Sequence, residues 1–95
     1  MNPIDQLLQY ILKMAEITPK GGNFTLDSRT ANLLVNREAI IDTDLITRAW
    51  KRSLEKNAMI FMESISSNQW KFYITSDAKL IARLQTALNS KAQVN

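Results

Sequence analysis

The chain of 95 residues contains neither cysteine nor histidine, and these two absences exclude several kinds of site. Without cysteine there is no disulfide framework and no thiolate chemistry. Without histidine the chain lacks the usual general base and the commonest metal ligand. Ser-His-Asp triads and Cys/His zinc sites are therefore excluded, and we expect no catalytic activity, no metal and no other cofactor.

Long apolar runs are also missing from the N-terminal segment. Asp5 and Glu16 flank short apolar clusters there, and no basic leader precedes them. We therefore expect neither a signal peptide nor a membrane span, which predicts a cytoplasmic protein without a membrane partner. With 45% hydrophobic and 22% charged residues, the length suits a single domain over residues 1–95.

Acidic residues are scarce in the second half of the chain. Residues 1–42 carry four Lys/Arg against five Asp/Glu, whereas residues 43–95 carry eight against four. The two halves thus contribute −1 and +4 to the net charge of +3. This asymmetry indicates an anionic partner for the second half, although charge alone does not distinguish nucleic acid from an acidic protein.

Proline and glycine, with two residues of each, mark the ends of the first predicted helix. Asn2 and Pro3 form a typical helix start, and an apolar stripe at i, i+3, i+4 and i+7 spacing predicts a helix over residues 3–17. The pair Gly21 and Gly22 then forms a turn. It is not a phosphate loop, because no Gly-Lys-Ser/Thr follows.

The remaining patterns predict one short strand, three more helices and a β-hairpin. These elements are expected at residues 23–26 (strand), 29–36 (helix), 43–56 (helix), 59–65 and 70–75 (hairpin strands) and 77–90 (helix). Asp27 or Ser28 can cap the second helix, and Asp42 or Thr43 the third. The connector of residues 36–42 before the third helix is expected to bury Ile40 and Ile41.

The most informative segment is the third helix, which has one apolar and one basic half. Its apolar half consists of Leu45, Ile46, Ala49, Trp50, Ser53 and Leu54. Its basic half consists of Arg48, Lys51, Arg52 and Lys56, with only Glu55 among them. A basic half suits phosphate contacts, and it is also typical of the solvated side of any surface helix.

Polar residues flank this helix at both ends. Asp42 and Asp44 are more typical of caps at the positive end of a helix dipole than of a metal site. Asn57 is expected to stop the helix, because Asn tolerates the left-handed conformation. The predicted hairpin follows, with Trp70 and Phe72 on one face of its second strand and Lys71 on the other. We expect Trp70 to pack against the third helix.

The element order, and the run from Thr43 to Ile60 in particular, resembles a winged helix-turn-helix domain. This run reads as a polar cap, an Arg-Ala pair, further basic residues and a Glu-Lys stop before an aliphatic strand. The likeness extends from about Thr25 to Thr75, with Asn57 where glycine is usual. It implies an α+β, mostly helical fold: helix, short strand, helix, helix, β-hairpin wing and C-terminal helix.

The resemblance implies binding of double-stranded DNA, with the third helix in the major groove and the hairpin along the backbone or in the minor groove. Arg48 and Arg52 would reach base edges, since a guanidinium pairs bidentately with guanine. Thr43, Lys51 and Lys56 would hold phosphates. The residues implied to face DNA are Thr43, Thr47, Arg48, Lys51, Arg52, Lys56, Asn68 and Lys71.

Two features depart from an ordinary DNA-binding domain of this kind. The hairpin tip has no Arg or Lys between Glu63 and Trp70, which leaves the wing contact to Lys71 or to neutral residues. The connector between the second and third helices is also long. Winged helices serve as protein-binding modules too. The alternative function is therefore an adaptor or inhibitor that presents its basic helix to an acidic protein surface.

We expect the protein to be a transcriptional regulator, or a replication or partition factor, that forms a homodimer. The first helix and the last one carry more apolar surface than a winged-helix core of this length needs. The stripe of the last helix consists of Leu80, Ile81, Leu84, Ala87 and Leu88. Pairing these two helices across a two-fold axis would supply a second half-site for tight binding.

Overall fold

The computed structural model describes residues 2–93, with side chains described as far as Thr86. It contains four helices and a three-stranded antiparallel sheet, and about half of the chain is helical. The elements are α1 (Pro3–Ile17), β1 (Asn23–Asp27), α2 (Ser28–Leu34), α3 (Thr43–Leu54), β2 (Ile60–Ser66), β3 (Gln69–Ile74) and α4 (Ala78–Gln93). The predicted α+β class is confirmed, and each predicted element lies within a few residues of its expected bounds.

The sheet has the strand order β1-β3-β2, so the N-terminal strand pairs with the second strand of the hairpin. In this register Phe72 lies between Phe24 of β1 and Met62 of β2. The rings of Phe24 and Phe72 stack with their centroids 5.1 Å apart. Along β3, Trp70, Phe72 and Ile74 alternate with half-buried residues and face the core, as the predicted alternation requires.

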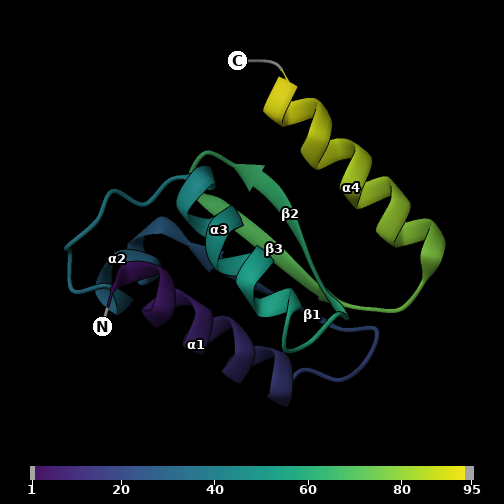
Figure 1. The fold of residues 1–95 in the computed structure, drawn as a ribbon, viewed down its shortest axis with the longest axis horizontal. Coiled ribbons are helices and arrows are strands. Elements are labelled where there is room, and N and C mark those ends of the chain that lie inside the picture. Colours follow the sequence, from purple (N-terminus) through teal and green to yellow (C-terminus); the bar gives the residue numbers. More distant parts are fainter. Residues whose placement is uncertain (1, 94–95) are drawn as a thin grey trace.

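Three of the helices pack together, and the fourth packs along one edge of the sheet. Figure 1 shows α3 in front of the sheet, α1 beside α3, and α4 at the side of β2. The second helix, α2, contacts α1 and β1. Buried residues from every helix and strand form one hydrophobic core, to which Trp50 and Trp70 both belong. The predicted packing of these two tryptophans is confirmed.

Side-chain caps fix where the first three helices begin. Oδ1 atoms of Asn2, Asp27 and Asp42 accept hydrogen bonds of 2.9, 2.7 and 2.8 Å from the backbone N–H three residues further along. Such a cap satisfies a donor that has no partner inside the helix. The structure thus selects Asp27 over Ser28 and Asp42 over Thr43 as the caps of α2 and α3.

Two predictions about connecting segments are wrong. Asn57 does not adopt the left-handed conformation: among the described non-glycine residues only Asn36 and Arg37 have positive φ, at 55° and 60°. Asn57 instead accepts a hydrogen bond on Oδ1 from Met59 N at 3.0 Å, which turns the chain toward β2. Ile40 is not buried under the connector, because 84% of its surface is exposed.

The apolar stripe of α1 is covered within the chain. Ile11 is fully buried and Leu8 is 8% exposed, and α1 packs chiefly on α3. The centre of the stripe that suggested dimerisation through α1 is therefore used by the monomer core. On α4, Leu84 is buried, whereas the side chains of Ala87 and Leu88 lie outside those that the structure describes. Dimerisation remains a prediction that α1 no longer supports.

Candidate nucleic-acid interface

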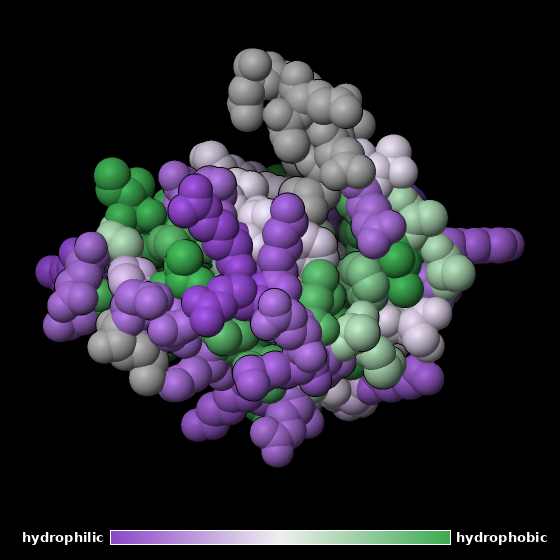
Figure 2. All heavy atoms as spheres, in the orientation of Figure 1, coloured by the Kyte–Doolittle hydropathy of each residue, from purple (hydrophilic) through white to green (hydrophobic). Residues whose placement is uncertain are grey.

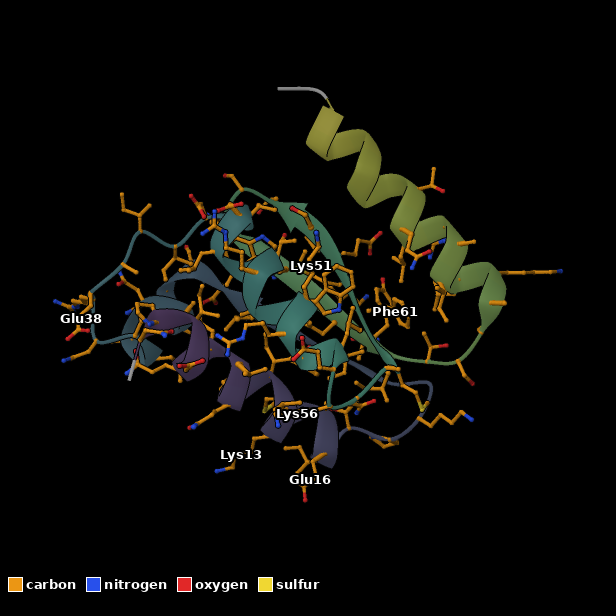
Figure 3. All side chains as sticks on the ribbon, viewed as in Figure 1. Lys13, Glu16, Glu38, Lys51, Lys56 and Phe61 are labelled. Atoms are coloured by element: carbon orange, nitrogen blue, oxygen red, sulfur yellow. The ribbon has the colours of Figure 1, made fainter. Side chains whose placement is uncertain are left out.

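The outward side of α3 carries the basic residues that the sequence predicts. The side toward the core consists of Ile46, Ala49, Trp50 and Ser53. Arg48, Lys51 and Arg52 are exposed, and Thr47 is half-buried. Figure 2 shows hydrophilic side chains gathered over α3 and α1, and in Figure 3 Lys51 lies over α3 on the same face. The predicted division of this helix into a buried half and a basic half is confirmed for Arg48, Lys51 and Arg52, whereas Lys56 lies two residues beyond the end of α3.

Two tryptophans fix the orientation of α3 on the sheet. Trp50 donates a hydrogen bond from Nε1 to the carbonyl oxygen of Ile60 at 2.8 Å, and its ring meets Phe61 edge-on with the centroids 6.4 Å apart. Trp70 of β3 donates from Nε1 to Thr43 Oγ1 at 3.0 Å. The first turn of α3 is thereby tied to β3 and its later turns to β2. These two hydrogen bonds therefore fix which side of α3 faces the sheet and which side, the basic one, faces outward.

Both arginines on this side form ion pairs with carboxylates. Arg48 Nε lies 3.0 Å from Asp44 Oδ2, one turn earlier in the helix. Arg52 Nη1 lies 2.9 Å from Asp5 Oδ1 of α1. The two arginine side chains are 64% and 51% exposed, and ion pairs at such positions contribute only about 0–1 kcal/mol. A ligand that binds a guanidinium bidentately can therefore displace either carboxylate.

Lys51 and Lys56 have no such acidic partner. Both are exposed, and neither forms an ion pair within residues 2–93. Figure 3 shows Lys51 over α3 and Lys56 at the end of the helix nearer α1. A lysine ammonium is a compact charge on a flexible stem, which suits contact with phosphates. A polyanion can therefore reach both ammonium groups without displacing an acid.

The hairpin turn is held against the helices and does not extend as a free wing. Asp27 at the end of β1 pairs with Gln69 at the start of β3, so β1 lies alongside the hairpin as far as its turn. The Asn68 carbonyl oxygen accepts a hydrogen bond from Ser28 N at 2.8 Å, and Asn68 Oδ1 accepts one from Ser66 Oγ at 2.7 Å. Asn68 is therefore fixed beside the start of α2, and Figure 1 shows the turn near the first turn of α3.

Lys71 lies on the face of the sheet opposite α3. It alternates with the buried residues Trp70 and Phe72, and its Nζ lies 5.2 Å from the centre of the Tyr73 ring. The structure therefore does not bring Lys71 together with the basic residues of α3. The contact that the resemblance implies for it does not share a surface with the others.

The neighbours of Lys71 are engaged with one another. Tyr73 donates a hydrogen bond from its hydroxyl to Glu63 Oε1 at 2.7 Å. Burial raises the pKa of Tyr73, the Glu63 carboxylate raises it further, and Arg83 of α4 opposes the shift. This cluster joins β2, β3 and α4, and the Tyr73 hydroxyl is occupied by Glu63.

Sequence reasoning missed the acidic partners of the two arginines. Asp44 and Arg48 have the i, i+4 spacing of a helical ion pair, so this contact could have been predicted from the sequence. Asp5 reaches Arg52 only because α1 packs on α3, and no local pattern shows this. Thr43 was assigned to a phosphate, yet its oxygen accepts the Trp70 hydrogen bond. The Thr43 hydroxyl hydrogen is the part that can still donate to a ligand.

No group of acidic side chains that could hold a metal ion occurs within the described residues. Asp42 caps α3 and Asp44 pairs with Arg48, which accounts for both carboxylates.

None of the helices described is long and apolar enough to cross a bilayer. No protein-family model, curated protein or solved structure matches the chain.

Proposed function

We propose that this protein is a winged-helix domain that binds double-stranded DNA through the exposed side of α3. The division of this helix is the observation that carries the proposal. Its buried residues anchor it in the core, while Thr47, Arg48, Lys51 and Arg52 form a strip on the outside. The major groove, about 12 Å wide, admits an α-helix presented in this way.

The order of the elements supports the proposal. Two successive helices, α2 and α3, precede a β-hairpin, and β1 completes the sheet in the order β1-β3-β2. In a helix-turn-helix the second of two such helices enters the groove. The connector of residues 35–42 is longer than a tight turn. This length matters little here, because hydrogen bonds of Trp50 and Trp70 orient α3.

Each polar residue on this side has a role in the proposal. Arg48 and Arg52 exchange their carboxylate partners for base edges, where guanine O6 and N7 accept a bidentate guanidinium. Lys51 and Lys56 contact phosphates, which position the helix without reading sequence. Asn68, at the hairpin turn near the start of α3, can donate from its amide to a neighbouring phosphate.

The biological role that we propose is transcriptional regulation, or replication or partition of DNA. A single helix of this length reads a short site, so a regulator of this size gains affinity from a second half-site. Because α1 is covered within the chain, α4 is the one of the two predicted dimerisation elements that this proposal retains.

Duplex binding over a salt series, followed by site selection, tests the proposal. Lys51→Ala should weaken binding to every duplex and reduce the slope of log K against log salt by about one, because one phosphate contact is lost. Arg48→Ala should cost about 1–3 kcal/mol on the selected site and much less on random DNA.

The matched control is Lys71→Ala, which removes the same charge from the other face of the sheet. It should leave duplex affinity nearly unchanged. Equal losses for Lys51→Ala and Lys71→Ala would mean that only overall charge matters, and α3 would then not be the binding element. A wild-type protein without salt-sensitive duplex binding would refute the proposal outright.

A second candidate function is a protein-interaction module that uses the same helix. The neutral hairpin turn, fixed against α2 by the Ser28–Asn68 hydrogen bond, favours it because no basic wing reaches outward. Under this alternative an acidic protein surface pairs with Arg48, Lys51 and Arg52. Capture of such a partner that is lost in Lys51→Ala, with no duplex binding by the wild type, would select the alternative.

A further inference from the structure

A hollow of about 370 Å³ lies on α2 and on the connector that follows it, and the DNA proposal does not use it. It is lined by Arg29, Asn32, Leu33 and Arg37. The first three are spaced i, i+3 and i+4 and therefore share one side of α2. The other side of the helix packs in the core through Ala31, which is fully buried.

An unusual backbone conformation brings Arg37 to this hollow. Asn36 and Arg37 both have positive φ, a conformation that residues other than glycine seldom adopt. Arg37 N donates a hydrogen bond to the Asn32 carbonyl oxygen at 2.9 Å. The chain thus folds back at the end of α2, and Arg37 lines the same hollow as Arg29 two turns earlier.

The hollow combines positive charge with exposed apolar surface. Neither Arg29 nor Arg37 forms an ion pair within residues 2–93. Asp27, two residues before Arg29, caps α2 and also interacts electrostatically with Arg29. Glu38, next to Arg37 in sequence, lies at the outer edge of the connector in Figure 3. Leu33 is 63% exposed and supplies apolar surface beside the two guanidinium groups.

The connector adds a second exposed aliphatic side chain. Ile40 is 84% exposed, and Figure 2 shows hydrophobic colour over the connector at the upper left of this face. The hollow and the connector therefore offer two cations, one amide and aliphatic surface, without a compensating acid among the residues that line the hollow.

We propose that this hollow binds an acidic and aliphatic segment of a partner protein. Each guanidinium can hold a carboxylate through two parallel hydrogen bonds, and the Asn32 amide can pair with a peptide group. Leu33 packs against an aliphatic side chain of the partner. A nucleic-acid backbone supplies phosphates but no aliphatic group for Leu33, which is why the lining favours a peptide.

A labelled peptide, Ser-Glu-Leu-Glu-Glu-Leu-Glu-Ser, tests this proposal with the full chain by fluorescence anisotropy. Arg29→Gln combined with Arg37→Gln should weaken peptide binding by about tenfold or more, because both carboxylate contacts are lost. Leu33→Ser should weaken it by about tenfold, because the apolar contact is lost. Lys51→Ala on α3 is the matched control and should leave peptide affinity unchanged, whatever it does to DNA binding.

Several results would overturn the proposal. One is the absence of peptide binding at millimolar concentration, and another is equal binding of a peptide with Ser in place of both Leu residues. A third is a loss of duplex affinity in the Arg29→Gln/Arg37→Gln protein that matches the loss of peptide affinity, which would make the hollow a phosphate site. Circular dichroism of each variant checks the fold, since all three side chains are exposed at the surface.

Discussion

At the scale of single residues, Thr43 has both a structural contact and a place in the proposed interface. Its oxygen accepts the hydrogen bond from Trp70 Nε1, and Trp70 is fully buried. Thr43→Val keeps the shape of the side chain but leaves the indole N–H without its acceptor. We expect a loss of about 1–3 kcal/mol in the free energy of unfolding, measured by urea denaturation.

Thr47→Val is the matched control for this substitution. Thr47 is on the same helix and half-buried, and no hydrogen bond of its side chain occurs among the described contacts. Its replacement should change stability by roughly 0.5 kcal/mol or less. Equal losses for the two variants would show that the bond between Thr43 and Trp70 does not hold α3 in place.

The lowered pKa of Asp27 should make the free energy of unfolding depend on pH. Its backbone hydrogen bond from Thr30 is the main cause that lowers the pKa of this carboxyl. A lowered pKa in the folded state means that the unfolded chain binds the proton first as the pH falls. The stabilisation by ionised Asp27 is therefore present above about pH 4 and is lost as the pH falls through the lowered value.

Asp27→Asn separates this effect from capping, because an Asn side chain also caps helices but does not titrate. The difference in unfolding free energy between wild type and variant should shrink as the pH is lowered from about 5 to about 2. Urea denaturation at a series of pH values measures this. A difference that stays constant would show that the charge of Asp27 does not contribute.

At the scale of elements, α1 is a structural part of the monomer. Ile11 is fully buried where α1 packs on α3, so Ile11→Asp places an unpaired charge in the core. We expect a loss of about 3–5 kcal/mol or more and an unfolded chain by circular dichroism. Gln9→Asp, at an exposed position of the same helix, should remain folded. A folded, monomeric Ile11→Asp protein in sedimentation would contradict this role and restore α1 as a dimerisation surface.

The elements that could be predicted from the sequence are those with local signals. Asn2, Asp27 and Asp42 cap helices whose apolar stripes also follow the helical period. Alternation along β3 correctly separates Trp70 from Lys71. Both kinds of signal depend on residues a few positions apart, which is why they can be read without the fold.

Other features depend on contacts between distant segments. The pairing of β1 with β3 holds the hairpin turn against α2, and the hairpin sequence alone does not show it. Asn57 was expected to be left-handed, yet it accepts a hydrogen bond from Met59, whereas Asn36 and Arg37 adopt positive φ. Several polar residues can make such turns, and tertiary packing selects among them.

At the scale of the whole molecule, the charge of the proposed interface is lower than its basic residues suggest. Asp44 and Asp5 each pair with an arginine there, and the second of these acids comes from another helix. The sequence therefore predicts which residues of α3 face outward, but not how much of their charge remains uncompensated. Lys51 has no acidic partner among the described residues, so its removal should weaken phosphate contact more than removal of either paired arginine.

The central claim, duplex binding through α3, is tested most directly by comparing two triple variants of equal charge. Arg48, Lys51 and Arg52 become Ala in one, and Lys20, Lys71 and Lys79, which lie outside both α3 and α1, become Ala in the control. The measurement is the affinity of each folded protein for the selected duplex at physiological salt. The α3 variant should bind at least about tenfold more weakly than the wild type, because base and phosphate contacts are both lost. The control should lose less than about threefold, because salt screens distant charges. An α3 variant that binds the duplex as tightly as the control would contradict the proposal.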